Sequence, residues 1–152
     1  MTIIPYTSAY KQILSALMAD YMAELECDIP REIILGKLAD FIDRQCQAGL
    51  IRIDLVMEED LCIGFSVYQI DRPESDWCKR PGWGFVREFY VVPACRGRHT
   101  GKLLAEHTEQ RLHSLGTEHL YLTSTEAALF WQKCGWTFTG ELCSNGQYIL
   151  EK

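Results

Sequence analysis

A short basic segment near the middle of the chain has the residue types needed to hold an anion. It follows Val92-Pro93 and comprises Arg96, Gly97, Arg98, His99, Thr100, Gly101 and Lys102. If a helix begins near Thr100, its free backbone N–H groups and the positive end of its dipole converge on one place. Glycines let a ligand approach the backbone, and the cationic side chains add charge. The segment is our candidate phosphate-binding loop, and a solvated basic helix start is the alternative.

A second candidate is Glu88, the single carboxylate in the mainly apolar run 83–92. Partial burial there would raise its pKa toward the range of a useful general base. A salt bridge to Arg87 or to a basic loop residue is the competing interpretation. Both interpretations remain open at this point.

Two nucleotide-binding motifs can be excluded for the basic loop. A P-loop has four residues between its first glycine and the Gly-Lys pair, but only three separate Gly97 from Gly101. Leu103 also stands where Ser or Thr would hold magnesium. No G-x-G-x-x-G spacing occurs, which excludes a Rossmann fingerprint.

The elements that position these residues follow from hydrophobic spacing. Helices are predicted over 8–26, between Pro30 and Gly49, over 100–115, and over a short segment that ends at Gly135. Ser8 would cap the first of these helices, and a Thr123–Glu126 capping box would open the last. Strands are predicted over 2–6, 51–57, 61–67, 83–92, 119–123, 136–142 and 147–151, with a tight turn at Asn145-Gly146. We therefore expect an α/β fold: a mixed sheet of about six to seven strands with about four helices on both faces, and a parallel crossover around the helix at 100–115.

Composition limits the class of protein. The 152 residues are 47% hydrophobic and 24% charged, which is typical of one globular domain over 1–152. The net charge of −6 argues against nucleic acid or a membrane surface as partner, although residues 79–111 carry seven basic and only three acidic side chains. The seven cysteines are never closer than nine residues, which does not suggest a disulfide framework or C-x-x-C chemistry. No stretch is apolar enough to span a bilayer, and no leader is apparent. We therefore expect a cytoplasmic protein. The four histidines lack metal-ligand spacing, and we expect no metal site.

On these motifs the chain resembles the GNAT superfamily of N-acetyltransferases. The family's pyrophosphate loop has the pattern Arg/Gln-x-x-Gly-x-Gly/Ala after a strand, and Arg96 and Gly101 match its first and last positions, with His99 in place of the middle glycine. The family stretch Asn-x-x-Ala-x-x-aliphatic-Tyr-x-Lys-x-Gly-Phe aligns with residues 124–136. There Ala127, Lys133 and Gly135 match, Trp136 replaces one aromatic by another, and Ser124 and Trp131 depart. The resemblance covers nearly the whole chain.

The resemblance implies direct transfer of an acetyl group from acetyl-CoA, as cosubstrate, to a primary amine of a small molecule or peptide. It implies a general base at Glu88 and a backbone N–H near Val92 that polarises the thioester carbonyl. It assigns cofactor binding to Tyr90, Val91, Val92, Arg96, Gly97, Arg98, His99, Thr100, Gly101, Lys102, Ser124, Ala127 and Trp131.

The leaving thiolate needs a hydrogen-bond donor or a proton source. Trp131 occupies the position of the family's usual tyrosine acid, and an indole N–H donates a hydrogen bond but supplies no proton. Ser124, Tyr121, Cys134 or water could substitute, and a thiol pKa near 8.5 makes a CoA thiolate a tolerable leaving group. The alternative function is a catalytically weak or inactive acyl-CoA-binding or sensor domain on the same fold.

The acceptor site is expected to lie in the N-terminal part of the chain and to be acidic. The acidic first 60 residues would favour a cationic amine. We expect the two N-terminal helices and the loop 71–82 to form the acceptor pocket, with Tyr68, Trp77 and Trp83 either lining it or belonging to the core. By family resemblance alone, a homodimer through the C-terminal hairpin is possible.

Overall fold

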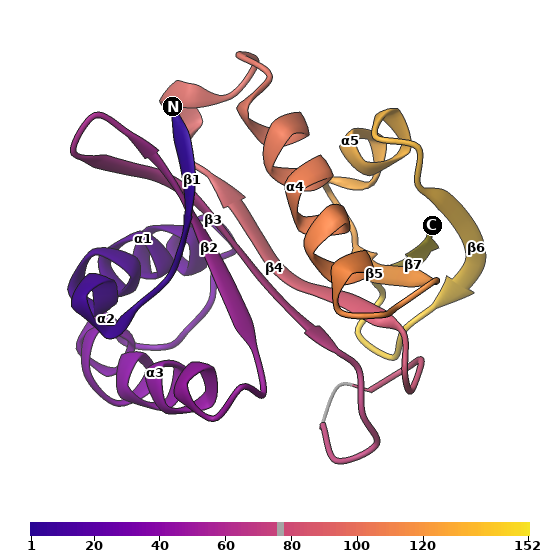
Figure 1. Ribbon diagram of the computed structural model, residues 1–152, viewed down its shortest axis with the longest axis horizontal. Helices are drawn as coiled ribbons and strands as arrows, with labels where there is room; N and C mark the ends of the chain where they lie inside the picture. The colour runs from indigo at the N-terminus through magenta and orange to yellow at the C-terminus, as the bar shows by residue number, and fades with distance from the viewer. Residues whose placement is uncertain (76–77) are drawn as a thin grey trace.

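The structure is a computed structural model that describes residues 1–75 and 78–152, and within them seven strands form one mixed sheet (Figure 1). The strands are β1 (Thr2–Pro5), β2 (Arg52–Glu58), β3 (Leu61–Ile70), β4 (Gly84–Val91), β5 (Leu120–Ser124), β6 (Thr137–Leu142) and β7 (Tyr148–Glu151). The helices are α1 (Lys11–Glu24), α2 (Arg31–Ile33), α3 (Ala39–Gln47), α4 (Thr100–Ser114) and α5 (Ala128–Lys133), and a π-helical turn (Ile34–Leu38) joins α2 to α3. The predicted mixed α/β fold is confirmed.

The strand order is β1-β2-β3-β4-β5-β7-β6. All neighbouring pairs are antiparallel except β4 and β5, which are parallel and connected through α4. The expected crossover around the helix at 100–115 is therefore present. Parallel neighbours need such a long connection, and this one places the start of α4 just after the end of β4.

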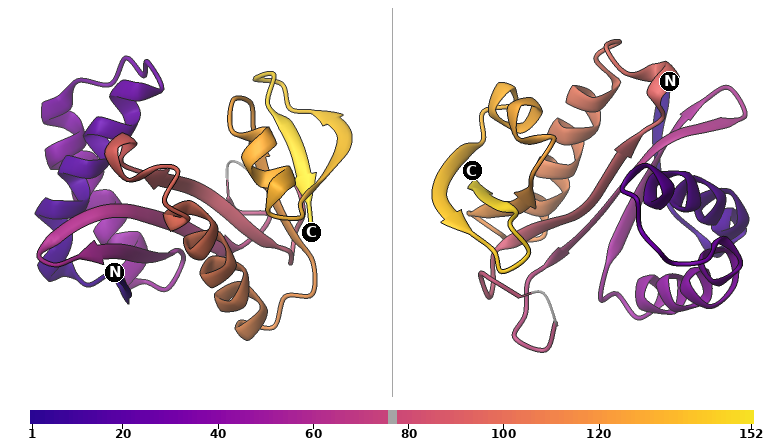
Figure 2. Two further views of the ribbon diagram at one scale, coloured as in Figure 1. Left: turned by 90° about the horizontal axis from the view of Figure 1, so that it is seen from above. Right: turned by 180° about the vertical axis from the view of Figure 1, so that it is seen from behind.

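The two faces of the sheet are covered by different helices (Figures 1 and 2). On one face, α1 and α3 pack against β2 and β3 around Leu14, Leu55 and Phe65. On the other face, α4 and α5 pack around Leu112 and Trp131. These two apolar layers hold the sheet rigid from both sides.

The most consequential irregularity lies in the middle of β4. The pairing with β3 shifts between Val67 and Tyr68, which leaves Arg87 as an extra residue on β4. Side chains in a regular strand alternate, so Val86 and Glu88 would face the same side. The bulge reverses the alternation: Val86 packs with the α4 layer, whereas Glu88 bonds to α1.

Beyond the bulge, β4 and β5 separate. They pair only from Gly84 to Val86 and from Leu120 to Leu122, while β4 continues to pair with β3 as far as Val91. On its other edge, β5 pairs with β7 from Tyr121 to Ser124. The sheet is therefore split between two strands at the end where α4 begins.

Three local predictions are wrong. Ser8 does not cap α1; it lies in a 3-10 turn, and its hydroxyl donates to Asp43. The Thr123–Glu126 capping box does not form, because α5 starts at Ala128 without a side-chain cap, and Thr123 donates to Gln147. The β6–β7 connection is longer than a tight two-residue turn, and of Asn145-Gly146 only the glycine has a positive φ, +81°.

The loop after β3 is fastened to the sheet by a buried carboxylate. Asp71 accepts hydrogen bonds from the backbone N–H groups of Lys79 and Arg80 and from the Tyr121 hydroxyl. Tyr68 is fully buried and donates to Asp54, and the Trp83 ring lies against His119 at a tilt of 33°, with ring centroids 5.0 Å apart. Trp77 lies outside the described residues.

No helix in the described part of the chain is long and apolar enough to cross a bilayer.

Candidate active site

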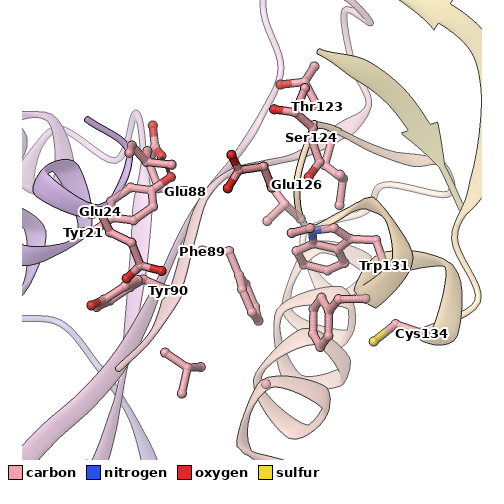
Figure 3. Close-up of a pocket in the computed structure, with 18 of the residues that line it drawn as sticks. Tyr21, Glu24, Glu88, Phe89, Tyr90, Thr123, Ser124, Glu126, Trp131 and Cys134 are labelled. Atoms are coloured by element: carbon pink, nitrogen blue, oxygen red, sulfur yellow. Dashed lines mark hydrogen bonds between the residues drawn. The ribbon is translucent and has the colours of Figure 1, made fainter. Parts of the chain in front are cut away.

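The split between β4 and β5 opens a cleft of about 1160 Å³. Its walls are β4 from Val86 to Val91, the segment Leu122–Ala127, and Phe130 and Trp131 of α5 (Figure 3). The loop before α4 closes one end of the cleft. The C-terminal part of α1, including Tyr21 and Glu24, also lines the cleft. Neither Tyr68 nor any described residue of 71–83 lines it, so the expected contribution of that loop to an acceptor pocket is not observed here.

The end of the cleft beside α4 offers unsatisfied backbone donors. Within the described residues, the N–H groups from Arg98 to Lys102 have no acceptor, and α4 has no side-chain cap. Gly97 (φ +75°) and His99 (φ +65°) turn the chain into this arrangement. Free N–H donors and the positive end of the helix dipole suit an anion such as a phosphate group. Gly101 permits close packing there, because an added Cβ would lie 3.1 Å from the Phe130 ring.

The two arginines of the loop are engaged elsewhere. Arg96 forms an ion pair of 2.7 Å with Glu24, donates from Nε to the Val91 carbonyl, and lies over the Tyr90 ring. Arg98 pairs with Glu58 at 2.7 Å and does not line the cleft. Thr100 is buried and, like Val92, also lies outside the lining. The free donors at this end of the cleft are therefore backbone N–H groups rather than guanidinium groups.

The β4 backbone N–H that faces the cleft belongs to Val91, beside the position near Val92 that the resemblance implied. The Val92 N–H donates to the Ile63 carbonyl at 2.9 Å and is not available to a ligand. Successive residues of an antiparallel strand direct their backbone groups to opposite edges, so the Val91 N–H faces the split. The Val91 carbonyl, which points to that same edge, accepts from Arg96.

Glu88 lies on the cleft wall and is held by α1. The Tyr21 hydroxyl donates to Glu88 Oε2 at 2.6 Å. Burial raises the pKa of Glu88 above that of an ordinary glutamate, and the Tyr21 hydrogen bond and the Arg87 charge offset part of the rise. The alternative salt bridge is not formed, because Arg87 donates to Gln69 instead. Burial also raises the pKa of Tyr21, which therefore stays protonated and donates.

Trp131 forms the wall opposite Phe89. It is 4% exposed and packs edge-on against Phe89, Phe130 and Trp136, with centroids 4.7, 5.0 and 5.4 Å away. Its indole N–H has no acceptor among the described residues, and Figure 3 shows the nitrogen on the side of the ring nearer to Ser124. Trp131 therefore presents a free donor at the cleft.

The three other side-chain candidates for a partner of the leaving thiolate differ in position. Ser124 is 8% exposed and lines the cleft, with no hydrogen-bond partner for its hydroxyl in the described chain. Tyr121 bonds to Asp71 away from the cleft and cannot act there. Cys134 lines the cleft, and burial raises the pKa of its thiol.

Several lining residues were not recognised from the sequence. Tyr21 and Glu24 belong to a helix that we expected to border an acceptor pocket, but Tyr21 was recognised only as part of its apolar face, and Phe89 and Phe130 had the pattern of core residues. Glu126 was assigned to a cap that does not form. Only the tertiary arrangement brings α1 against the β4 bulge, so no local signal could have identified Tyr21.

A substitution at His99 tests the backbone of the loop. A non-glycine residue in the left-handed region costs about 1 kcal/mol relative to glycine. We expect His99→Gly to raise the free energy of unfolding by about this amount, measured by urea denaturation, because His99 is exposed and has φ +65°. An unchanged free energy would show that imidazole contacts offset the backbone strain.

The cleft combines the free N-terminus of α4 at one end with the Glu88 carboxylate on its β4 wall. The family described as the Acetyltransferase (GNAT) family matches residues 11–136, so the chain belongs to it. A search of curated proteins found no match.

Solved structures agree on the fold at low identity. An aminoglycoside 6'-N-acetyltransferase complexed with coenzyme A has a TM-score of 0.76 and 15% identity, covering 100% of this chain and 96% of its own. Aminoglycoside N-acetyltransferase AAC(6')-Iy in complex with CoA has a TM-score of 0.73 and 17% identity, covering 93% and 91%. PaiA N-acetyltransferase from Thermoplasma acidophilum, in complex with coenzyme A, has a TM-score of 0.72 and 17% identity, covering 100% and 99%.

Proposed function

We propose that the protein transfers the acetyl group of acetyl-CoA directly to a primary amine of a small molecule or peptide, with Glu88 as the general base. The observation that carries the proposal is the Glu88 carboxylate, which the β4 bulge turns to Tyr21 on the wall of the cleft. Membership of the acetyltransferase family and structural similarity to aminoglycoside N-acetyltransferases support it.

Acetyl-CoA would supply the acetyl group as an activated thioester. The backbone N–H groups from Arg98 to Lys102 would hold its phosphates, and the free edge of β4 would bind its amide groups. The Val91 N–H at this edge is the donor suited to a carbonyl that gains negative charge. Ser124 and Trp131 add side-chain donors on the opposite wall.

An amine must lose a proton before it can attack a carbonyl. Alkylammonium groups have pKa values near 10, so a nearby acceptor is needed at neutral pH. Glu88 is suited to this because burial raises its pKa, which makes the carboxylate a stronger base than an exposed glutamate. The Tyr21 hydrogen bond fixes its orientation.

On the leaving-group side, Trp131 donates without supplying a proton. We expect Trp131→Phe to lower kcat about tenfold while acetyl-CoA affinity is unchanged, because a hydrogen bond to the developing thiolate is lost. Thiol release and calorimetry measure the two effects, and thermal unfolding checks that the aromatic packing survives. An unaltered kcat would limit Trp131 to packing.

The proposal is tested by titrating the purified protein with acetyl-CoA and then measuring thiol release with a panel of amines. Binding followed by amine-dependent release supports the transferase. Binding without release for any amine would favour the alternative, an acyl-CoA-binding or sensor domain. Absence of binding would contradict the assignment of the phosphate end.

A further inference from the structure

One ion pair connects the loop before α4 with the end of α1. Arg96 Nη2 lies 2.7 Å from Glu24 Oε1 and 2.9 Å from Glu24 Oε2. Glu24 is the last residue of α1, and Figure 3 shows it with Tyr90 on the wall that faces Trp131. Both members of the pair line the cleft. The pair therefore joins two parts of the cleft lining that are 72 residues apart in the sequence.

The same guanidinium group covers the free edge of β4. Arg96 Nε donates to the Val91 carbonyl at 2.9 Å, and the guanidinium carbon lies 5.6 Å from the centroid of the Tyr90 ring. The Val91 carbonyl belongs to the edge that β5 leaves open, because the pairing of β4 with β5 ends at Val86. An extended ligand with amide groups would use this carbonyl as an acceptor, as an added strand does. Arg96 therefore occupies a backbone group that such a ligand needs.

An anion at the start of α4 would compete with Glu24 for Arg96. The N–H groups from Arg98 to Lys102 have no acceptor in the described chain, and Arg96 belongs to the same loop. A guanidinium group binds a phosphate with the same paired hydrogen bonds that it offers a carboxylate. The side chains of Arg96 and Glu24 are 46% and 42% exposed, and ion pairs at such exposure are weak. Arg96 can therefore pass from Glu24 to a phosphate at small cost.

We propose that Glu24 holds Arg96 across the open edge of β4 in the free protein, and that acetyl-CoA must take Arg96 from Glu24 in order to bind. This inference rests on the acetyl-CoA binding of the proposed function. On exchange, Arg96 bonds to a phosphate, and the Val91 carbonyl becomes available to an amide N–H of the ligand. Glu24 is a positioning residue, since it acts on the ligand only through Arg96. Because the ligand binds only molecules in which Arg96 is released, the ion pair lowers the apparent affinity.

The test is calorimetric titration of acetyl-CoA into the native protein, Glu24→Gln, Arg96→Gln and the double variant. We expect Glu24→Gln to bind about fivefold more tightly, because a weak ion pair no longer competes for Arg96. Arg96→Gln should bind more weakly, because a phosphate loses its partner. The double variant should match Arg96→Gln, since Glu24 has no effect once the arginine is gone. A role of Glu24 in the fold alone would not produce a gain in affinity that depends on Arg96.

Glu26→Gln is the matched control for charge. Glu26 also lines the cleft, follows the same end of α1, and pairs with no basic side chain among the described residues. Its replacement removes the same charge near the ligand without releasing Arg96. We expect the affinity of this variant to stay within about twofold of the native value, because salt screens charges that make no direct contact.

The outcomes separate this inference from the proposed function. Equal or weaker binding in Glu24→Gln, the same gain in Glu26→Gln, or a gain that persists without Arg96 would overturn the competition by Glu24. Each of these results would leave acetyl-CoA binding, and with it the transferase, in place. Absence of acetyl-CoA binding in the native protein and in every variant would overturn the proposed function and this inference together.

Discussion

Replacing Glu88 by glutamine is expected to lower acetyl transfer about 100-fold while acetyl-CoA binds as before, because general base catalysis is lost and the phosphate end is untouched. In the native protein, activity should rise with pH as Glu88 loses its proton, at a pH above the ordinary pKa of a glutamate because burial raises that pKa. Glu88→Gln should abolish this rise. Thiol release measured across pH, with calorimetric titration of acetyl-CoA, tests both effects.

Tyr21→Phe is the matched variant, since it keeps the carboxylate and removes its hydrogen bond. The bond stabilises the charged form, so its loss should raise the Glu88 pKa further and move the rise in activity to higher pH. Loss of fold is not expected in Glu88→Gln. Native Glu88 binds its proton more tightly than the unfolded chain does, so its charge opposes folding as pH rises. A Glu88→Gln enzyme with an unaltered rate would remove Glu88 from the mechanism.

The sequence was most informative where function depends on local structure. The strand, loop and helix around Arg96–Lys102 are adjacent in the chain, and hydrophobic spacing with glycine positions predicted them and the parallel crossover. The ion-pair partner of each arginine in the loop could not be predicted from the sequence. Glu24 and Glu58, which hold Arg96 and Arg98, are far away in sequence and reach the loop only in the folded protein.

The bulge at Arg87 shows a second limit of sequence analysis. Periodicity assumes a regular strand, and one extra residue reverses which face every following side chain occupies. Glu88 was recognised by its residue type, but its partner Tyr21 depends on that reversal. Val91 rather than Val92 directs its N–H to the cleft, because successive residues of an antiparallel strand point their backbone groups to opposite edges and the Val92 N–H donates to Ile63.

The phosphate end allows an equally large effect at Gly101. We expect Gly101→Asp to weaken acetyl-CoA binding at least about 100-fold, because a carboxylate would lie among the backbone donors that face the phosphates. The fold should survive, since an acidic residue in the first turn of α4 interacts favourably with the helix dipole. Calorimetric titration and thermal unfolding measure these two properties.

Gly101→Ala distinguishes charge from crowding. Both variants add a Cβ at 3.1 Å from Phe130, but alanine carries no charge and should reduce affinity only a few-fold. The difference between the two variants should shrink as ionic strength rises, because salt screens the repulsion between carboxylate and phosphate. Equal losses in both variants at every salt concentration would make Phe130 crowding the cause. Unchanged affinity in Gly101→Asp would place the phosphates away from the start of α4 and contradict the assignment of the whole cleft.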